Sequence, residues 1–532
     1  MVLRSSFNFI RKLYLNSSFY NKKISEIDEK TLDYRPSLSI ISCIIKYEKE
    51  KNKIEDYYLN SIWEDKEINE SDYNKLHSFF WLFTLDLKSS KKIVQSIIKN
   101  LIKNNQNYNS KNWEIDILSK RIISWISNSK LTYENSEEEY KKKFNFLVKK
   151  QINHLINEIN RSELVDDKMI GCTAVILSGL SYKHEKFLNY GLNLLKKIIN
   201  FSFDQDGFPK SRNFRQLSFY LKYFVLIREW LKESQSEIPE YIDETIFHLG
   251  KSYNFIWQSI KQPLLFNGNH EVNHYDFDKY LENHGYRFVN KSNFIGGYAI
   301  LKNRNFILSM DLGAPPDKKF STNFQAGSLS FEFLYKNQKV VCNSGYFQKH
   351  NHQLNLISKS SANHSTLIID NRSSIKFNKN LSGISKIQKG LKILKKSFFS
   401  EKNYWNIGGA HDGYLKEYGI IHERQIEFFP ENYKLIGQDK LIKKKNIKSS
   451  NFEIRFHLLP EIKVTKTQDG KSILIELENS GWKFFTNHGL IDIETGLYFG
   501  KKNSYSENQN IFICGNTQKG DQIIEWEIIK IK

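Results

Sequence analysis

The segment Asn323–Phe347, NFQAGSLSFEFLYKNQKVVCNSGYF, decides the fold class of the second half of the chain. Apolar and polar residues alternate along it, and Leu329, Phe331 and Phe333 fall on one face of an extended chain. Successive side chains of a strand point to opposite sides, so this period of two predicts sheet. The polar side chains of the same segment raise a second question, whether chemistry takes place there.

The period of two extends over the whole region beyond about residue 275. It first occurs in GYAILKNRNFILSMDLG, residues 297–313, and it returns in KVTKTQDGKSILIELENSGWKFF, residues 463–485. The second stretch contains Asp469-Gly470, a dipeptide typical of tight hairpin turns. Many short antiparallel strands without intervening helices predict stacked sheets in a β-sandwich.

The first half of the chain has a helical period instead. In RQLSFYLKYFVLIREWL, residues 215–231, the apolar residues recur at the three- and four-residue spacing of an amphipathic helix. Several such segments follow one another with short connections, which predicts a toroid or a solenoid of helix hairpins. The polar, turn-rich segment Leu264–Tyr280 marks the expected boundary between a helical domain, residues 1–270, and a sandwich domain, residues 271–532.

The chain is strongly basic, with a formal net charge of +20 over 532 residues. Such a surface attracts nucleic acid, anionic lipid or acidic polysaccharide, although lysines can also simply solvate a surface. We predict no nucleic-acid partner because no recognised nucleic-acid module accompanies the charge. The basic N-terminus lacks a continuous apolar core, so no signal peptide is expected, and no apolar run is long enough for a transmembrane segment.

Cysteine spacing and short motifs exclude several classes of site. Cys43, Cys172, Cys342 and Cys514 are widely separated, so we expect unpaired thiols and neither a zinc nor a disulfide framework. The sequence contains no phosphate-binding loop, dinucleotide fingerprint, nucleophile elbow or zinc-protease motif. We therefore expect no cofactor.

Three polar residues of the second half are candidate catalytic groups. His411 and Tyr414 lie in GAHDGY, and His364 lies in ANHSTLIID. A neutral imidazole can act as a general base and a phenol as a proton donor when neighbours hold them in place. The alternative is structural, because a single histidine more often caps a strand or bonds a buried backbone group.

The loop DQDGFPKSRNF, residues 204–214, offers candidate substrate-binding groups. Lys210, Arg212 and Asn213 follow one another closely between two helical segments. Arginine can bind a carboxylate through two parallel hydrogen bonds and asparagine can add a neutral donor, so the loop can clamp an acidic sugar. The alternative is a turn followed by a helix cap, with Ser211 or Asn213 as the capping residue.

An ordered set of phrases carries a resemblance to a known family. In the first half they are LHSFFWL (76–82), WEIDILSKRIISW (113–125) and DQDGFPKSRN (204–213). In the second half they are DLGAPP (311–316), QAGSLSFEF (325–333), VCNSGYF (341–347), SANHSTLIID (361–370), HDGYLKEYGIIHERQIEF (411–428) and FHLLP (456–460). The chain resembles the heparinase II/III-like polysaccharide lyases. The resemblance implies an incomplete (α/α) toroid followed by an antiparallel β-sandwich, a substrate cleft between them, and β-elimination on uronate-containing glycans.

The resemblance also implies where the chain departs from its family. The family usually has two histidines at the positions of Asn323 and Gln325, and a zinc-binding Asp at the position of Asn343, whereas His364 matches. Amides are poor ligands for such a zinc site, so we expect no metal. Asn323 and Gln325 are instead expected to bind substrate.

We therefore expect a probable lyase of acidic glycans whose residues serve a variant mechanism. Arg212 and Asn213 are expected to hold the uronate carboxylate, His411 to act as the base, Tyr414 to act as the acid, and His364 to position the strand around them. The alternative is an inactive glycan-binding or envelope-assembly protein on the same fold. The missing signal sequence favours the cytoplasm, whereas the family's usual substrates favour the periplasm or cell envelope, and the sequence decides neither the compartment nor the oligomeric state.

Overall fold

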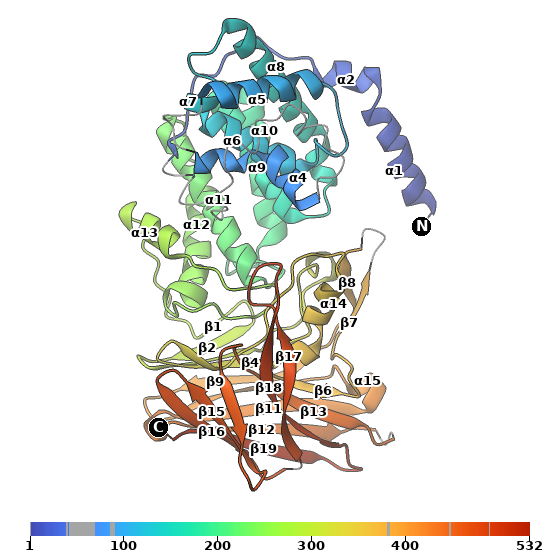
Figure 1. Ribbon diagram of the computed structural model, residues 1–532, viewed down its shortest axis with the longest axis vertical. Coiled ribbons are helices and arrows are strands. Elements are labelled where there is room, and N and C mark those ends of the chain that lie inside the picture. Colours follow the sequence, from blue (N-terminus) through green and yellow to red (C-terminus); the bar gives the residue numbers. More distant parts are fainter. Residues whose placement is uncertain are drawn as a thin grey trace. The chain divides into compact units, whose positions relative to one another are not determined.

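A computed structural model of the protein describes residues 2–38, 41, 70–85, 91–379, 383–445, 448–488 and 490–531. The chain forms two compact units, which are coloured by sequence in Figure 1. The first unit comprises Met1–Ser202, Phe219–Phe247 and Lys279–His284. The second comprises Phe203–Ser218, His248–Asp278 and Gly285–Lys532, and it contains every strand of the described residues.

The described residues that precede the sheets are mainly helical. Their α-helices are α1 (Val2–Leu15), α2 (Ser18–Ile24), α4 (Glu70–Ser78), α5 (Lys91–Asn104), α6 (Ile115–Ser127), α7 (Ser129–Thr132), α8 (Glu138–Glu158), α9 (Val165–Ser181), α10 (Glu185–Ser202), α11 (Phe214–Glu233), α12 (Glu240–Tyr253) and α13 (Tyr275–Asn283).

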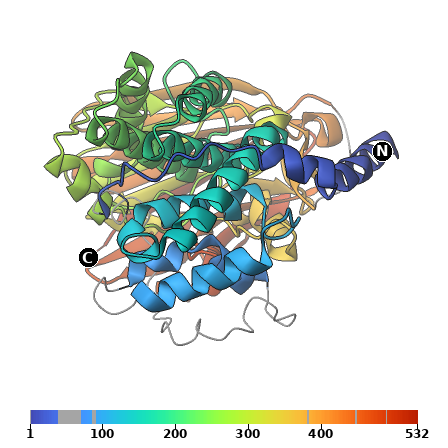
Figure 2. The ribbon, with the colours of Figure 1, turned by 90° about the horizontal axis from the view of Figure 1, so that it is seen from above.

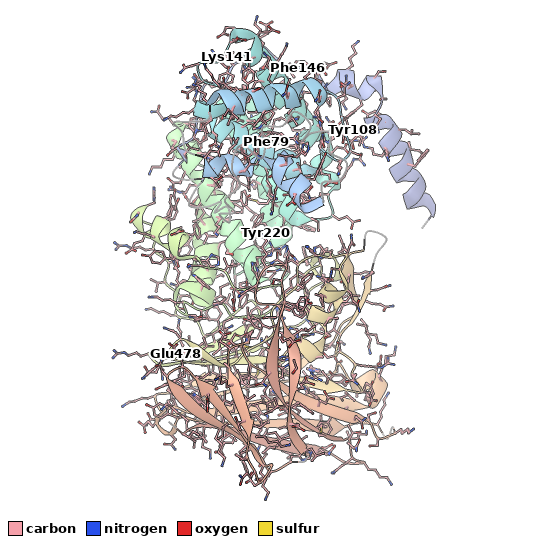
Figure 3. All side chains as sticks on the ribbon, viewed as in Figure 1. Phe79, Tyr108, Lys141, Phe146, Tyr220 and Glu478 are labelled. Carbon is pink, nitrogen blue, oxygen red and sulfur yellow. The ribbon has the colours of Figure 1, made fainter. Side chains whose placement is uncertain are left out.

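Helix α9 is the centre of the helical unit. Every residue from Met169 to Ser181 is buried, and the helix packs against both α6 and α10. Asp166 and Asp167 occupy its first turn, where the helix dipole favours negative charge. Elsewhere in the unit, Phe79 is buried with its ring edge-on to Trp125 at 5.3 Å, and Figure 3 labels its place among the helices. Figure 2 shows the same helices from above.

The second unit consists mainly of antiparallel strands. They are β1 (Phe294–Ile295), β2 (Tyr298–Lys302), β3 (Phe306–Asp311), β4 (Phe331–Tyr335), β5 (Gln338–Val341), β6 (Leu367–Ile369), β7 (Lys376–Lys379), β8 (Ser385–Lys389), β9 (Ile393–Ser400), β10 (Trp405–His411), β11 (Ile420–Phe429), β12 (Lys434–Lys443), β13 (Asn451–His457), β14 (Lys463–Lys466), β15 (Ser472–Leu477), β16 (Ser480–Thr486), β17 (Leu490–Tyr498), β18 (Ser506–Asn516) and β19 (Gln522–Lys530). Two short helices, α14 (Gln353–Lys359) and α15 (Leu415–Tyr418), interrupt them.

The strands form three main sheets and a small hairpin. A five-stranded sheet has the order β1-β2-β3-β4-β5, and a four-stranded sheet has the order β17-β18-β13-β6. The largest sheet has eight strands in the order β14-β15-β16-β19-β12-β11-β10-β9, and β7 pairs with β8 alone. Alternate residues of β11 and β12 are buried, which is the pattern of a sheet with one face on a core.

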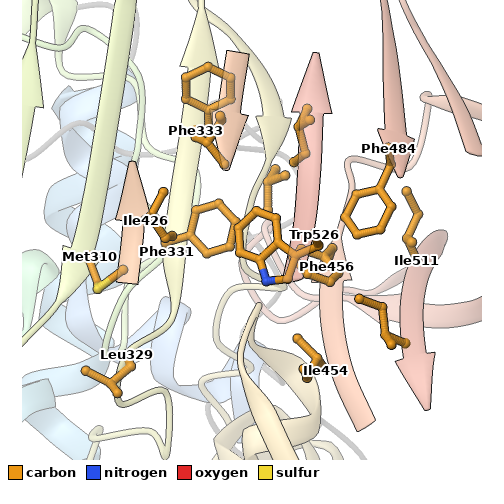
Figure 4. Close-up of a cluster of buried hydrophobic side chains, with 14 of the residues drawn as sticks. Met310, Leu329, Phe331, Phe333, Ile426, Ile454, Phe456, Phe484, Ile511 and Trp526 are labelled. Carbon is orange, nitrogen blue, oxygen red and sulfur yellow. The ribbon is translucent and has the colours of Figure 1, made fainter. Parts of the chain in front are cut away.

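Trp526 joins the three main sheets, as Figure 4 shows. Its indole, on β19, stacks on Phe331 of β4 at 5.4 Å and meets Phe456 of β13 edge-on at 4.8 Å. Leu329 and Phe333 belong to the same buried cluster, so the face expected from the alternating segment does contact the core. The opposite face of β4 is also buried, and there Glu332 forms a salt bridge with Lys339.

Two further expectations concern cysteines and membrane spans. Cys172, Cys342 and Cys514 are free thiols, and the prediction for Cys43 falls outside the described residues. Within the part of the chain that the structure describes, no helix has both the length and the apolar character that crossing a membrane requires.

We predict that Trp526→Ala lowers the free energy of unfolding by about 3–5 kcal/mol, because removing a large buried ring leaves a cavity at the junction of three sheets. Ile523→Ala is the matched control on the same strand, since Ile523 is 54% exposed and should change stability by less than about 0.5 kcal/mol. Urea unfolding followed by far-ultraviolet circular dichroism measures both. Equal stability of the two variants would contradict this packing.

Candidate functional site

The site is built around Arg212, in the loop before α11. Its guanidinium donates from Nε to Gly296 O at 2.9 Å and from Nη1 to Gly313 O at 3.1 Å and Ala314 O at 3.3 Å. The remaining terminal nitrogen, Nη2, forms an ion pair with Asp311 at the end of β3. Gly313 is required there, because a Cβ at that position would lie 2.3 Å from the guanidinium carbon. The loop is therefore fixed to the five-stranded sheet.

The donors of Arg212 are thus occupied by the protein itself. The side chain is buried, and although burial opposes it, Asp311 raises the pKa of Arg212. The sequence predicts that this guanidinium holds a substrate carboxylate. Because its donors bind the protein instead, we assign Arg212 to positioning its neighbour Asn213. Arg212 adopts a φ of 59°, a left-handed conformation that costs a residue other than glycine about 1–3 kcal/mol. Such strain persists only where surrounding contacts impose it.

Asn267 connects this anchor to the segment before β4. Its Nδ2 donates to Asp311 Oδ2 at 2.9 Å and to the Tyr298 hydroxyl at 2.6 Å. Its Oδ1 accepts from the backbone N–H of Gln325 at 3.2 Å, and Gln325 Oε1 accepts from the N–H of Gly268 at 2.9 Å. We call Asn213, Asn267, Gly268, Asn323 and Gln325 the amide cluster.

Asn213 has the only side-chain amide of this cluster whose buried Nδ2 makes no hydrogen bond among the described residues. Its Oδ1 accepts from the N–H of Gln216 at 3.2 Å, which caps the start of α11. A Cβ at Gly268 would lie 2.3 Å from this Nδ2 and 3.0 Å from Asn323 O, so only glycine leaves the donor room. A buried donor without a partner is costly in the free protein.

Two ionisable residues lie beside the amide cluster. The Tyr346 hydroxyl donates to Asn323 Oδ1 at 3.1 Å and accepts from Asn355 Nδ2 at 2.9 Å. His270 Nδ1 lies 2.9 Å from Gln348 Nε2, so it accepts from that amide. A neutral His270 then carries its proton on Nε2.

The charges around these two residues set their protonation. Burial lowers the pKa of His270 to about 3, and the nearby cations Arg215 and Lys502 act in the same direction, so His270 is neutral at physiological pH. Burial raises the pKa of Tyr346, and Arg215 partly offsets that rise, so Tyr346 holds its proton. Arg215 is half-buried and therefore brings a cation close to both groups.

The three residues of the family's zinc position do not fit a metal site. Gln325 donates from Nε2 to the carbonyls of Gly345 at 2.9 Å and Ser358 at 2.6 Å, so it presents no free ligand atom there. Asn343 donates to Glu332 at 3.3 Å. His364 donates from Nδ1 to Ser360 O at 2.9 Å, and burial lowers its pKa to about 4. Amide hydrogen bonds take the place of metal bonds at this position.

His411 belongs to a buried hydrogen-bond chain inside the sandwich. His422 donates from Nε2 to Asp439 at 2.7 Å, so its Nδ1 accepts from His411 Nε2 at 3.3 Å. The other nitrogen of His411 accepts from the N–H of Gly413 at 3.1 Å. Arg424 completes the chain with two bonds to Asp439, at 2.8 and 3.0 Å. Both ring nitrogens of His411 are occupied, and burial lowers its pKa well below the ordinary value.

Tyr414 is also an interior residue. Its hydroxyl donates to Leu367 O at 2.9 Å, and its ring lies 5.8 Å from that of His411. The structure thus brings His411 and Tyr414 close to each other but apart from the hydrogen bonds of the amide cluster. Both are buried, and their hydrogen bonds run to other groups of the sandwich rather than to the amide cluster.

Lys210 lies on the other side of Arg212, at a pocket of about 370 Å³. Three carboxylates, those of Asp204, Asp206 and Asp317, line the same pocket. Arg212 is neutralised by Asp311, so carboxylates outnumber the remaining cation. This pocket repels an acidic sugar rather than clamping it.

The sequence offered Arg212, Asn213, Asn323 and Gln325 as separate candidates, and the structure brings them into one neighbourhood. Sequence reasoning missed the residues that complete the site. Those are Arg215, Asn267, His270 and Tyr346. The available signal was the phrase NGNH, residues 267–270, in which polar residues surround a glycine directly after an apolar run.

We predict that the protein loses stability as the pH falls below about 6.5, the ordinary pKa of histidine. Burial lowers the pKa to about 4 for His364 and His154 and to about 3 for His457, so the unfolded chain binds more protons over that interval. Each such histidine lowers the free energy of unfolding by about 1.4 kcal/mol per pH unit between the two pKa values. Urea unfolding at several pH values between 5 and 8 measures the slope.

The matched variants are His364→Gln, which should reduce that slope, and His248→Gln at an exposed position, which should leave it unchanged. A free energy of unfolding that is constant between pH 8 and pH 5 would contradict the neutral, buried state of these rings.

Comparison with known proteins supports the same architecture. Heparinase III superimposes with a TM-score of 0.70 at 15% identity, covering 96% of this chain and 88% of that one. A mutant of the heparan sulfate lyase HepC from Pedobacter heparinus gives 0.66 at 13% identity, with 97% and 88% covered. A xanthan lyase from Paenibacillus gives 0.52 at 8% identity, with 97% and 60% covered. No curated protein sequence matches the chain.

These superpositions confirm the fold expected from the sequence, a helical toroid followed by an antiparallel β-sandwich. At such low identity they concern the fold alone. The family evidence is separate, because residues 295–527 match the model of the heparinase II/III-like C-terminal domain. That stretch runs from β1 to β19 and contains Asn323, Gln325 and Tyr346. Residues 295–527 therefore form a heparinase II/III-like C-terminal domain, with a divergent set of polar residues at its sandwich site.

Proposed function

We propose that the protein is a polysaccharide lyase that cleaves a uronate-containing glycan by β-elimination at the amide cluster. The observation that carries the proposal is the buried Nδ2 of Asn213, a donor without a partner among the described residues. A bound carboxylate oxygen would satisfy it and recover the cost of leaving it unpaired. The match of residues 295–527 to the heparinase II/III-like C-terminal domain and the lyases among the superimposed structures support this reaction class.

Binding of the uronate carboxylate is the first requirement of the reaction. Neutralising that carboxylate makes the adjacent C5 proton acidic, and hydrogen-bond donors aimed at it stabilise the charge that develops. Three groups meet this need: the Nδ2 of Asn213, the Nε2–H of neutral His270, and the cation of Arg215. Arg212 acts through Asn213, which it positions.

Proton transfer is the second requirement. The C5–H bond breaks, the C4–O4 bond breaks, and a C4–C5 double bond forms, so one proton leaves carbon and one reaches the departing oxygen. As the phenolate, Tyr346 would accept the C5 proton, and as the phenol it would give that proton to the departing O4; its hydroxyl already bonds the half-buried Asn323. Arg215 lowers the pKa of Tyr346 against the effect of burial, which assists loss of the phenolic proton.

The alternative function is glycan binding without cleavage. One observation favours it: Gln325 stands where the family usually has histidine, and its amide bonds two backbone carbonyls and cannot move a proton. In that case the amide cluster would still bind an acidic glycan. The two functions therefore share a ligand and differ in the product.

We predict that incubation with uronate-containing polysaccharides generates the ultraviolet absorbance of the C4–C5 double bond. Tyr346→Phe should lower the rate by about 10²- to 10⁴-fold, the usual contribution of a general acid or base. Asn213→Asp keeps the oxygen that caps α11 and removes the amide donor, so it should lower kcat/KM while leaving the melting temperature nearly unchanged.

Tyr414→Phe is the matched control, because Tyr414 is likewise a buried tyrosine whose hydroxyl bonds a backbone carbonyl. Loss of activity in Tyr414→Phe together with full activity in Tyr346→Phe would contradict this site. It would favour His411 as the base and Tyr414 as the acid, as predicted from the sequence. Saturable binding of an acidic oligosaccharide that depends on Asn213, without any unsaturated product from any substrate, would replace the lyase by the binding protein.

A further inference from the structure

The N-terminal helix α1 has an exposed apolar face. Phe9, Ile10 and Leu13 are 64%, 63% and 58% exposed. At the 100° per residue of an α-helix these three positions fall within an arc of about 100°, so they form one stripe along the helix. Figure 1 shows α1 in dark blue with this helix standing beside the other helices of its unit.

The opposite face of α1 is attached to the helical unit. Arg11 points away from the stripe and forms an ion pair with Glu158 at the end of α8. Leu15 lies on the same side as Arg11 and is buried. The helix is therefore held in one rotation about its axis, and that rotation leaves the apolar stripe exposed.

Phe19 at the start of α2 extends the stripe. It is 69% exposed, and its ring contacts that of Tyr14 at 6.3 Å, next to the stripe on α1. Tyr20 fixes the position of α2, because its hydroxyl bonds His154 at 2.8 Å and its ring meets Tyr108, which Figure 3 labels. We call Phe9, Ile10, Leu13 and Phe19 the N-terminal patch.

The charged side chains that α1 and α2 themselves carry beside the patch are all basic. Residues 1–25 contain five basic side chains, and the first acidic residue is Glu26. Lys12, Lys22 and Lys23 are exposed among the described residues and lie on the same two helices as the patch. Apolar side chains surrounded by cations are the pattern of a helix that lies in the interface of an anionic bilayer.

We propose that the N-terminal patch docks on an anionic lipid surface, with its apolar side chains among the acyl chains and the lysines at the headgroup phosphates. Charge complementarity selects this occupant. A second copy of the chain has a net charge of +20 and offers a repulsive surface, and a soluble polyanion gives the apolar side chains no medium to enter. The helix lies on the membrane, since no described helix is suited to span one.

Liposome flotation with the full-length protein tests the proposal. Vesicles of phosphatidylcholine and phosphatidylglycerol should bind the protein, and vesicles of phosphatidylcholine alone should bind it at least about tenfold more weakly, because each lysine near an anionic surface contributes about fivefold in affinity. Raising the salt concentration should weaken binding to the anionic vesicles. The double variant Phe9→Ser/Leu13→Ser should lower binding more than tenfold without changing the melting temperature.

The matched controls lie elsewhere on the helical unit. Phe247→Ser removes a ring that is 54% exposed, and Lys196→Gln/Lys197→Gln removes two exposed charges on α10; both should bind vesicles as the parent does. Equal binding to the two kinds of vesicle, or equal losses in the patch and control variants, would overturn the proposal. So would a concentration-dependent dimer that Phe9→Ser/Leu13→Ser abolishes, because the patch would then be an interface between two copies.

Discussion

The buried ion pair between Arg212 and Asp311 is the interaction on which the candidate site depends. It fixes a loop that follows α10 in the sequence onto the end of β3, about a hundred residues later. Removing one partner of such a pair leaves an uncompensated charge in the interior, which typically costs about 3–5 kcal/mol. Everything attached to the pair, from the cap of α11 to the bond between Asn267 and Asp311, shares that fixed geometry.

The residues at this site do different chemistry from the histidines and carboxylates usual in the family. An amide neither titrates in the physiological range nor binds zinc well, so Gln325 and Asn343 bring no charge to this position. In the proposed reaction Tyr346 exchanges the proton, Arg215 supplies the cation, and His270 contributes as a neutral donor. A site of this composition depends on proton donors that hold their protons.

Local patterns in the sequence predicted the fold because periods of two and of 3.6 residues are properties of neighbouring residues. Leu329, Phe331 and Phe333 lie in the core for that reason. The site could be predicted only in part, since long-range contacts decide it. Nothing within HDGY shows that His411 is closed in by His422 and Asp439, which lie on two neighbouring strands. Likewise, the sequence does not reveal that Asp311 pairs with Arg212 and that backbone carbonyls accept from its other donors.

Some of the lysines that make the chain basic lie on the edge strands of the eight-stranded sheet, where they affect self-association. The eight-stranded sheet ends in β14 on one side and β9 on the other, and both edges carry unpaired backbone groups that invite pairing with another sheet. Lys463 and Lys466 lie on β14, and Lys395 and Lys396 lie on β9. Bringing two such edges together places like charges side by side. Lysines on edge strands therefore oppose the pairing of this sheet with the same sheet of another copy.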